Sequence, residues 1–138
     1  MRVFNKLIAI TLMSVSTFSF AEVSVIVNSS NPDAIDTKLI KKLFLGKAKS
    51  FPSVGKAAIF SLKGESKDTV DFRQKALKKS NSQYKSYWSK LAFTGKGTPP
   101  KELGSDNELL NAVKSNPNAI GFISSANVTA DVKVVATF

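Results

Sequence analysis

The sequence predicts an α/β domain in which helices flank a mostly parallel sheet. Short apolar runs typical of buried strands alternate along the chain with longer segments of helical periodicity. This alternation favours parallel strands, because a parallel neighbour needs a crossover connection that is usually a helix. No repeat, low-complexity segment or linker divides the chain, so we expect one domain over residues 22–138 after a signal peptide over residues 1–21. The expected strands lie at residues 23–27, 57–60, 119–123 and 132–135.

The N-terminus has the pattern of a secretory signal peptide. Arg2 and Lys6 precede an apolar stretch that is too short to span a bilayer, and small residues at Ser19 and Ala21 predict cleavage before Glu22. The alternative is an uncleaved N-terminal anchor. A lipoprotein is not expected, because the chain has no cysteine. We therefore expect a secreted, periplasmic protein whose mature chain has no transmembrane segment.

The first expected strand ends in a polar loop that is a candidate ligand site. Asn28, Ser29 and Ser30 follow the apolar run and precede Pro32. In open α/β sheets, ligands bind beyond the carboxyl ends of the strands. The alternative is an ordinary turn built from turn-forming residues.

The stretch at residues 56–77 predicts a strand, a polar turn and an amphipathic helix. Lys63 and Gly64 lie in the turn, and Ser66 is placed to cap the helix. The first backbone N–H groups of a helix have no partner within it, so they can hold an anion, which Lys63 and Lys67 would attract. We therefore predict a ligand site at Lys63, Gly64, Ser66 and Lys67, with a simple capped helix start as the alternative.

Three further helices are expected, each with a polar residue at its start. Asp36 can cap a helix that runs to Phe44, and Ser105 opens a capping-box pattern for a helix that stops at Asn116. Between them, Ser82 is expected to start a helix whose apolar and aromatic residues recur at helical spacing. These residues predict a packed core face, with stacking on a sugar or a base as the alternative. They are Tyr84, Tyr87, Trp88 and Leu91.

The expected mature chain is strongly basic. The whole chain has 20 Lys and Arg against 10 Asp and Glu, and removal of Arg2 and Lys6 leaves 18 against 10. Such a balance attracts anionic partners, although a lysine group is also typical of a solvated helix face. Arg73 is the one arginine among these 18, whereas sequence-specific readers of nucleic acid usually depend on arginine. Nucleic acid is therefore not an expected partner.

The residue types give little support to catalysis. The chain has no histidine and no cysteine, so the commonest general base, the thiol nucleophile and the usual zinc ligands are missing. Glu65, Asp68 and Asp71 could form a carboxylate cluster, but acidic residues in a first helical turn normally complement the helix dipole. We expect a protein that is not an enzyme and that has no cofactor.

Three segments resemble the phosphate-binding proteins of ABC uptake systems. Residues 36–47, with Leu-Ile-Lys-Lys-Leu-Phe-Leu-Gly-Lys, look like the Ile-Phe-x-Gly-Lys helix end of that family, and residues 118–123, Asn-Ala-Ile-Gly-Phe-Ile, resemble its Ala-Ile-Gly-Tyr strand. Between them, Tyr87-Trp88 and residues 93–106 resemble a group of short, exported, single-lobe relatives. The resemblance implies a type II solute-binding-protein-like domain of one lobe, with phosphate as the ligand class and a membrane transporter as a partner.

The anion-binding motif of that family is matched only in part. In the family a Ser-Gly-Thr opens a helix, a phenylalanine follows six residues after the serine, and an arginine precedes it by four. Ser66 and Phe72 match these positions, whereas Lys67 and Asp68 replace the glycine and the threonine, and Leu62 replaces the arginine.

Two functions are expected from these observations. The first is weak binding of phosphate or another small oxyanion, at the start of the Ser66 helix together with the Asn28 loop. The alternative is a protein- or envelope-interaction module on the same scaffold, without a small-molecule ligand, in which lysine faces contact an anionic partner.

Overall fold

The structure is a computed structural model that describes residues 22–138. The predicted signal peptide, residues 1–21, lies outside the described residues. The helices are α1 (Thr37–Phe44), α2 (Lys67–Lys75), α3 (Asn81–Phe93), α4 (Asp106–Ser115) and a short 3-10 helix, η1 (Ser125–Asn127). The strands are β1 (Val23–Asn28), β2 (Ser50–Phe51), β3 (Gly55–Lys56), β4 (Ala58–Leu62), β5 (Lys101–Leu103), β6 (Ala119–Ser124) and β7 (Val132–Thr137).

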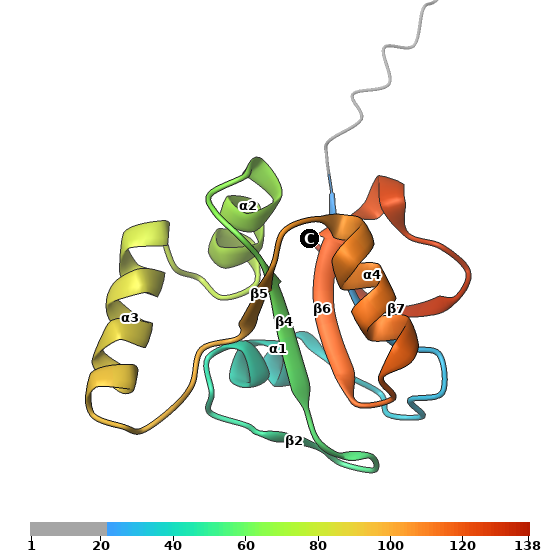
Figure 1. Ribbon diagram of the computed structural model, residues 1–138, viewed down its shortest axis with the longest axis horizontal. Coiled ribbons are helices and arrows are strands. Elements are labelled where there is room, and N and C mark those ends of the chain that lie inside the picture. The colour runs from blue at the N-terminus through green and yellow to red at the C-terminus, as the bar shows by residue number, and fades with distance from the viewer. Residues whose placement is uncertain (1–21) are drawn as a thin grey trace, which may run out of the picture.

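Five of the strands form one sheet, in the order β5-β4-β6-β1-β7 (Figure 1). β4 is parallel to β5 and to β6, whereas β1 is antiparallel to β6 and to β7. Four strands therefore point in one direction and β1 points in the other. The predicted α/β class with a mostly parallel sheet is confirmed. β2 and β3 form a separate antiparallel hairpin.

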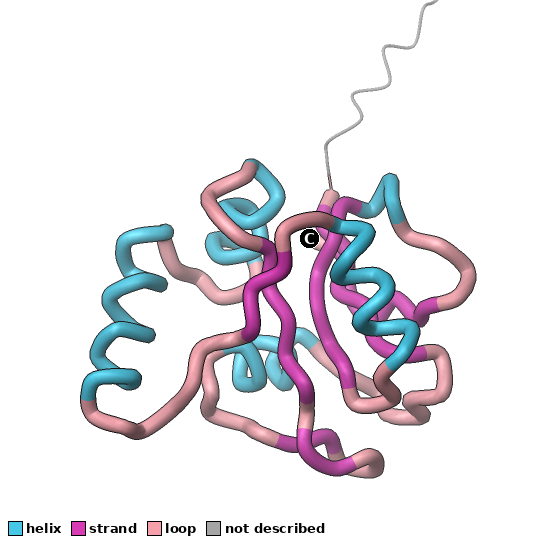
Figure 2. Tube along the Cα trace, in the orientation of Figure 1, coloured by secondary structure: helices cyan, strands magenta, loops and turns pink. Residues whose placement is uncertain are grey.

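Different helices cover the two faces of this sheet. Gly121 and Phe122 are neighbours on β6 and therefore point to opposite faces. Phe122 stacks on Phe72 of α2 with ring centroids 4.0 Å apart, and Phe72 meets Phe44 of α1 edge-on at 4.8 Å. Gly121 lies against Leu109 of α4. The helices thus form two layers around the sheet, with α1 and α2 on one face and α4 on the other (Figure 2).

α3 stands beside the sheet (Figure 1) and carries the aromatic core face that the sequence predicts. Tyr84 and Trp88 are buried, and Tyr87 is partly buried. The hydroxyl of Tyr87 donates a hydrogen bond to the carbonyl of Leu45, just after α1. The indole of Trp88 lies against Gly46, so α3 is fixed to the end of α1 as well as to α2. The packing interpretation of these aromatic residues is therefore confirmed.

The predicted helix starts are largely confirmed by their caps. The side chains of Asp36, Ser66 and Ser105 each accept a hydrogen bond from the backbone N–H three residues later. The predicted start of α3 at Ser82 is wrong, because Ser80 caps the helix and forms a reciprocal capping box with Gln83. This arrangement satisfies two N–H groups at once, which favours the earlier start. β2, β3 and β5 were not expected.

Within residues 22–138, no helix combines the length and the apolar character that crossing a bilayer requires.

Candidate anion-binding site

The predicted ligand site at the start of α2 lies just beyond the carboxyl end of β4 and is exposed to solvent. The N–H of Lys63 donates to the carbonyl of Leu103 at 2.8 Å, which holds the turn against β5. Gly64 has a φ of 78°, a conformation that favours glycine. The backbone N–H groups of residues 64–68 form no hydrogen bond with another described residue. They are therefore open to water or to an anion.

Two of the predicted polar side chains at this site are already engaged. Ser66 Oγ accepts a hydrogen bond from the N–H of Thr69 at 3.4 Å and lies 3.0 Å from Thr69 Oγ1. Lys67 forms an ion pair with Asp71, with Nζ and Oδ2 2.8 Å apart. This pair raises the pKa of Lys67 and lowers the pKa of Asp71. Lys63 has no ion-pair partner within residues 22–138.

The carboxylate of Asp68, in the first turn of α2, is affected by other acidic groups. Partial burial raises the pKa of Asp68, and the negative charges of Asp106 and Asp71 raise it further. Asp106 is the first residue of α4, and its Oδ2 accepts hydrogen bonds from the N–H of Ser124 at 3.1 Å and from Asn127 Nδ2 at 2.8 Å. Asp106 thus joins α4 to the end of β6. The charge of Asp68 opposes an anion at the start of α2.

The Asn28 loop lies at the opposite end of the sheet from the start of α2 (Figure 1). The end of β1 pairs with the beginning of β6, and the beginning of β6 pairs with the beginning of β4. Because β1 runs against the other strands, its carboxyl end lies at their amino ends. The structure therefore does not bring Asn28, Ser29 and Ser30 to Ser66, and the expected joint site is not formed.

The side chain of Asn28 holds the end of α4 and its own turn. Its Nδ2 donates to the carbonyls of Val113 at 2.9 Å and Lys114 at 3.1 Å, and its Oδ1 accepts from the N–H and the hydroxyl of Ser30. Ser29 and Ser30 are exposed, whereas Asn28 is buried. This geometry favours the alternative that the loop is a turn.

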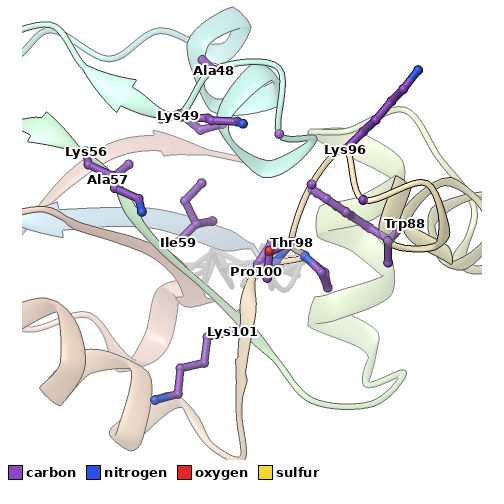
Figure 3. Close-up of a pocket in the computed structure, with 16 residues that line it drawn as sticks. Ala48, Lys49, Lys56, Ala57, Ile59, Trp88, Lys96, Thr98, Pro100 and Lys101 are labelled. Carbon is purple, nitrogen blue, oxygen red and sulfur yellow. The ribbon is translucent and has the colours of Figure 1, made fainter. Parts of the chain in front are cut away.

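A cleft of about 760 Å³ lies between the end of α1, the start of β4 and the segment that follows α3 (Figure 3). The ionisable side chains that line it are Lys49, Lys56, Lys96 and Lys101. None of the four forms an ion pair with a residue of the described chain. In Figure 3, Ile59 lies between Lys56 and Trp88, whereas Lys96 extends away from them. We call this feature the lysine cleft.

A second pocket, of about 680 Å³, lies between α2, α3 and the residues around β5. Arg73, which is only 3% exposed, lines it and lies with its guanidinium carbon 4.1 Å from the centroid of the Tyr84 ring. Its Nη1 donates to Asn81 Oδ1 at 2.9 Å. Lys85 and Glu65 also line this pocket and pair with each other, which lowers the pKa of Glu65. We call it the Arg73 pocket.

Arg73 was not among the predicted site residues. The sequence held one indication of its importance: Arg73 is the only arginine among the 18 basic residues of the expected mature chain. The burial of its side chain depends on how α2 and α3 pack, which the local sequence did not indicate.

Comparison with known proteins shows similarity to solved structures. No model of a known protein family matches the chain, and no curated protein matches it. One similar structure, from Clostridium perfringens, is named as a phosphate ABC transporter substrate-binding protein and holds bound phosphate. It is 19% identical to this chain, with a TM-score of 0.63, and the match covers 83% of this chain and 45% of that one. PstS from Borrelia burgdorferi is 12% identical with a TM-score of 0.63, over 85% of this chain and 48% of that one.

A third structure is an ABC-type phosphate transport receptor from Vibrio cholerae, 19% identical with a TM-score of 0.53, over 83% of this chain and 46% of that one. The chain has the fold of these substrate-binding proteins. It spans less than half the length of each. The resemblance found in the sequence, to a single-lobe version of this fold, is confirmed.

Proposed function

We propose that this chain is a periplasmic, non-enzymatic module that binds a small oxyanion, with phosphate as the first ligand to test. The observation that carries the proposal is the run of backbone N–H groups at residues 64–68, which have no partner in the described chain and of which the first four belong to exposed residues. N–H groups and the helix dipole at such a position favour an anion. Phosphate is supported by the names of the similar structures, one of which holds it.

Binding at this site is expected to be weak. The ligand would contact the exposed turn of Gly64 and the flexible side chain of Lys63, because Lys67 is paired with Asp71 and Ser66 caps its own helix. Asp68, in the first turn of α2, would oppose the ligand with its negative charge. A small ligand bound tightly is usually enclosed on most sides, whereas this site is open. We expect a dissociation constant on the order of 1 mM.

The decisive experiment is a calorimetric titration with phosphate of the protein, its Ser66→Ala variant and its Ser80→Ala variant. The side chains of Ser66 and Ser80 each accept a hydrogen bond from the N–H three residues later, so each substitution should lower the free energy of unfolding by about 1 kcal/mol. Only Ser66→Ala should weaken phosphate binding, by about threefold or more, since only Ser66 shapes the candidate site. The proposal fails if phosphate gives no saturable heat up to about 20 mM, or if both variants bind alike.

Export and a transporter partner belong to the same proposal. Expression of the full chain in a bacterium, followed by mass spectrometry of the periplasmic fraction, should yield a protein that begins at Glu22. Recovery of the intact chain in the membrane fraction would instead support the uncleaved anchor. A membrane transporter is the expected partner because the similar proteins carry transporter names.

The lysine cleft favours a second candidate function, in which the domain contacts an anionic protein or envelope surface. Its lining lysines carry no paired acid within the described chain, so they can attract an anionic surface. Vesicles rich in phosphatidylglycerol serve as the probe. Binding to the vesicles should decrease as the salt concentration rises. The double variant Lys49→Glu/Lys56→Glu should lose binding. The control Lys75→Glu/Lys90→Glu, which reverses the charge of two exposed lysines in other elements, should retain it. Equal binding by both variants would contradict this function.

A further inference from the structure

The Arg73 pocket gathers hydrogen-bond donors that have no acceptor. Among residues 22–138, three buried side-chain polar atoms lack a hydrogen-bond partner, and two of them belong to residues that line this pocket. They are Nε of Arg73 and Nε1 of Trp88, the second of which lies near the Tyr84 hydroxyl without a well-formed hydrogen bond to it. Both are N–H donors. Buried donors are rarely left unpaired, because each lost hydrogen bond has a large desolvation cost.

The environment of Arg73 adds a charge argument. An arginine that is nine-tenths or more buried is normally paired with a carboxylate. Arg73 forms no ion pair with any described residue, and its five N–H donors make one hydrogen bond, to Asn81. The Tyr84 ring beneath the guanidinium compensates the charge only in part. An anion would supply the missing partner.

The other charged groups that line the pocket are Lys85, Glu65 and Glu102. Lys85 and Glu65 pair with each other, so their charges nearly cancel, although the charge of Arg73 also helps to lower the pKa of Glu65. Glu102 is exposed and forms no ion pair with a described residue. Its charge should oppose an anion in the pocket, although solvent screens it more than the buried guanidinium.

The walls and the volume define the class of ligand. Trp88, Pro99 and Pro100 line the pocket beside the donors and offer apolar surface. A volume of about 680 Å³ is much larger than inorganic phosphate needs and lies in the range of sites for small organic molecules. We infer that the Arg73 pocket binds a small organic anion, whose carboxylate or phosphate group contacts Arg73 and Trp88 Nε1 and whose apolar part packs on Trp88 and the two prolines. The pocket adjoins the proposed site at Ser66, because Gly64 lines it, but this inference depends on other donors, those of Arg73 and Trp88.

Trp88 provides a direct signal for the test, because it is the only tryptophan in the chain. The probes are phenyl phosphate, benzoate and inorganic phosphate, added to the full protein while tryptophan emission is recorded. Phenyl phosphate or benzoate should give a saturable change with a dissociation constant below about 1 mM, whereas inorganic phosphate, which lacks an apolar part, should give at most a weak one. The two organic probes distinguish a phosphate ester from a carboxylate as the preferred group.

Variants assign the signal to the pocket. Arg73→Lys keeps the positive charge but removes the planar guanidinium group, which can donate two parallel hydrogen bonds to one anion. It should therefore weaken binding about tenfold. Glu102→Gln should strengthen binding about twofold, because it removes the opposing charge. Lys75→Met, which removes an exposed charge from the same helix, and Ser66→Ala should each leave the affinity within about twofold. The Ser66→Ala result separates this site from the proposed phosphate site.

The full protein and each variant are first checked by circular dichroism and thermal unfolding. If Arg73→Lys does not fold, Trp88→Phe replaces it, because phenylalanine keeps an aromatic wall and lacks the indole N–H; its binding is measured by calorimetry and should be weakened about fivefold. The inference is overturned if neither organic anion binds up to about 20 mM. It is also overturned if the folded Arg73→Lys or Trp88→Phe variant binds as tightly as the original protein.

Discussion

A Cβ atom at Gly121 would lie 2.5 Å from Cδ2 of Leu109, so α4 packs directly on the backbone of β6. Leu109 is fully buried, so its side chain could move only within the packed core. Gly121→Ala should therefore lower the free energy of unfolding by about 1–3 kcal/mol, as overpacking does in other cores. Gly104→Ala is the matched control, because its new Cβ would meet only the carboxylate of Glu108, at 3.4 Å, and should cost little. Chemical denaturation measures both, and equal stabilities would contradict the predicted packing.

Phe72 of α2 joins three elements of the core, since it stacks on Phe122 of β6 and meets Phe44 of α1 edge-on. Phe72→Ala should destabilise the fold by about 3–5 kcal/mol, the usual cost of removing a buried ring. Phe93 is 94% exposed, so Phe93→Ala should change stability by less than about 0.5 kcal/mol. A thermal unfolding series compares them. A small effect of Phe72→Ala would show that the ring at this position does not hold α2 to the sheet.

Asn28 is predicted to be structural. Asn28→Ala removes two hydrogen bonds to the last carbonyls of α4 and the turn contacts with Ser30, so it should lower the free energy of unfolding by about 1–3 kcal/mol. Phosphate affinity should not change, because the loop lies at the far end of the sheet from Ser66. Ser29→Ala, at an exposed neighbouring position, should affect neither property. Reduced phosphate binding by a folded Asn28→Ala protein would argue for a ligand site at this loop.

Asp68 should make anion binding depend on pH. Partial burial and the negative charges of Asp106 and Asp71 raise the pKa of Asp68 above its ordinary value of 3.8. The carboxylate is therefore protonated at a higher pH than an ordinary aspartate. Protonation removes a negative charge from the start of α2, and anion affinity should therefore rise as the pH is lowered toward the pKa of Asp68. Sulfate is the suitable probe, since its charge stays constant between about pH 4 and pH 7.

Asp68→Asn isolates this effect. The variant should bind sulfate about two- to fivefold more tightly at pH 7 and should show a flatter pH profile. Asp131→Asn removes an exposed carboxylate that pairs with Lys114 at the other end of α4, and its profile should match the original protein. Identical pH profiles for Asp68→Asn and the original protein would show that Asp68 does not affect anion binding at this site.

The local sequence was sufficient to locate most elements. Ser66 and Asp36 were predicted as caps because a side-chain oxygen at a helix start has a definite local partner, three residues along the chain. The aromatic face of α3 followed from helical spacing in the same way. The start of α3 was misplaced by two residues, because Ser80 and Ser82 offer the same chemistry and only the Gln83 contact distinguishes them. Short β5 has too few residues for a periodic pattern.

The candidate sites depended on relations that no local pattern contains. Asn28 and Ser66 each follow a strand, and both were expected at the same edge of a parallel sheet. The reversed direction of β1 separates them, and that direction is set by long-range pairing with β6 and β7. Arg73 shows the converse case, because its charge was visible in the sequence while its burial arises from the packing of α2 on α3.

The sequence by itself determined the α/β class, the helix caps, the apolar core segments and the likeness to phosphate-binding proteins, because each depends on neighbouring residues or on a short motif. Only the tertiary structure decided the direction of β1, the separation of the Asn28 loop from Ser66, and the gathering of unpartnered donors around Arg73. Those features arise from contacts between residues far apart in the chain, whose free energy depends on how whole elements pack and not on the preference of any one segment.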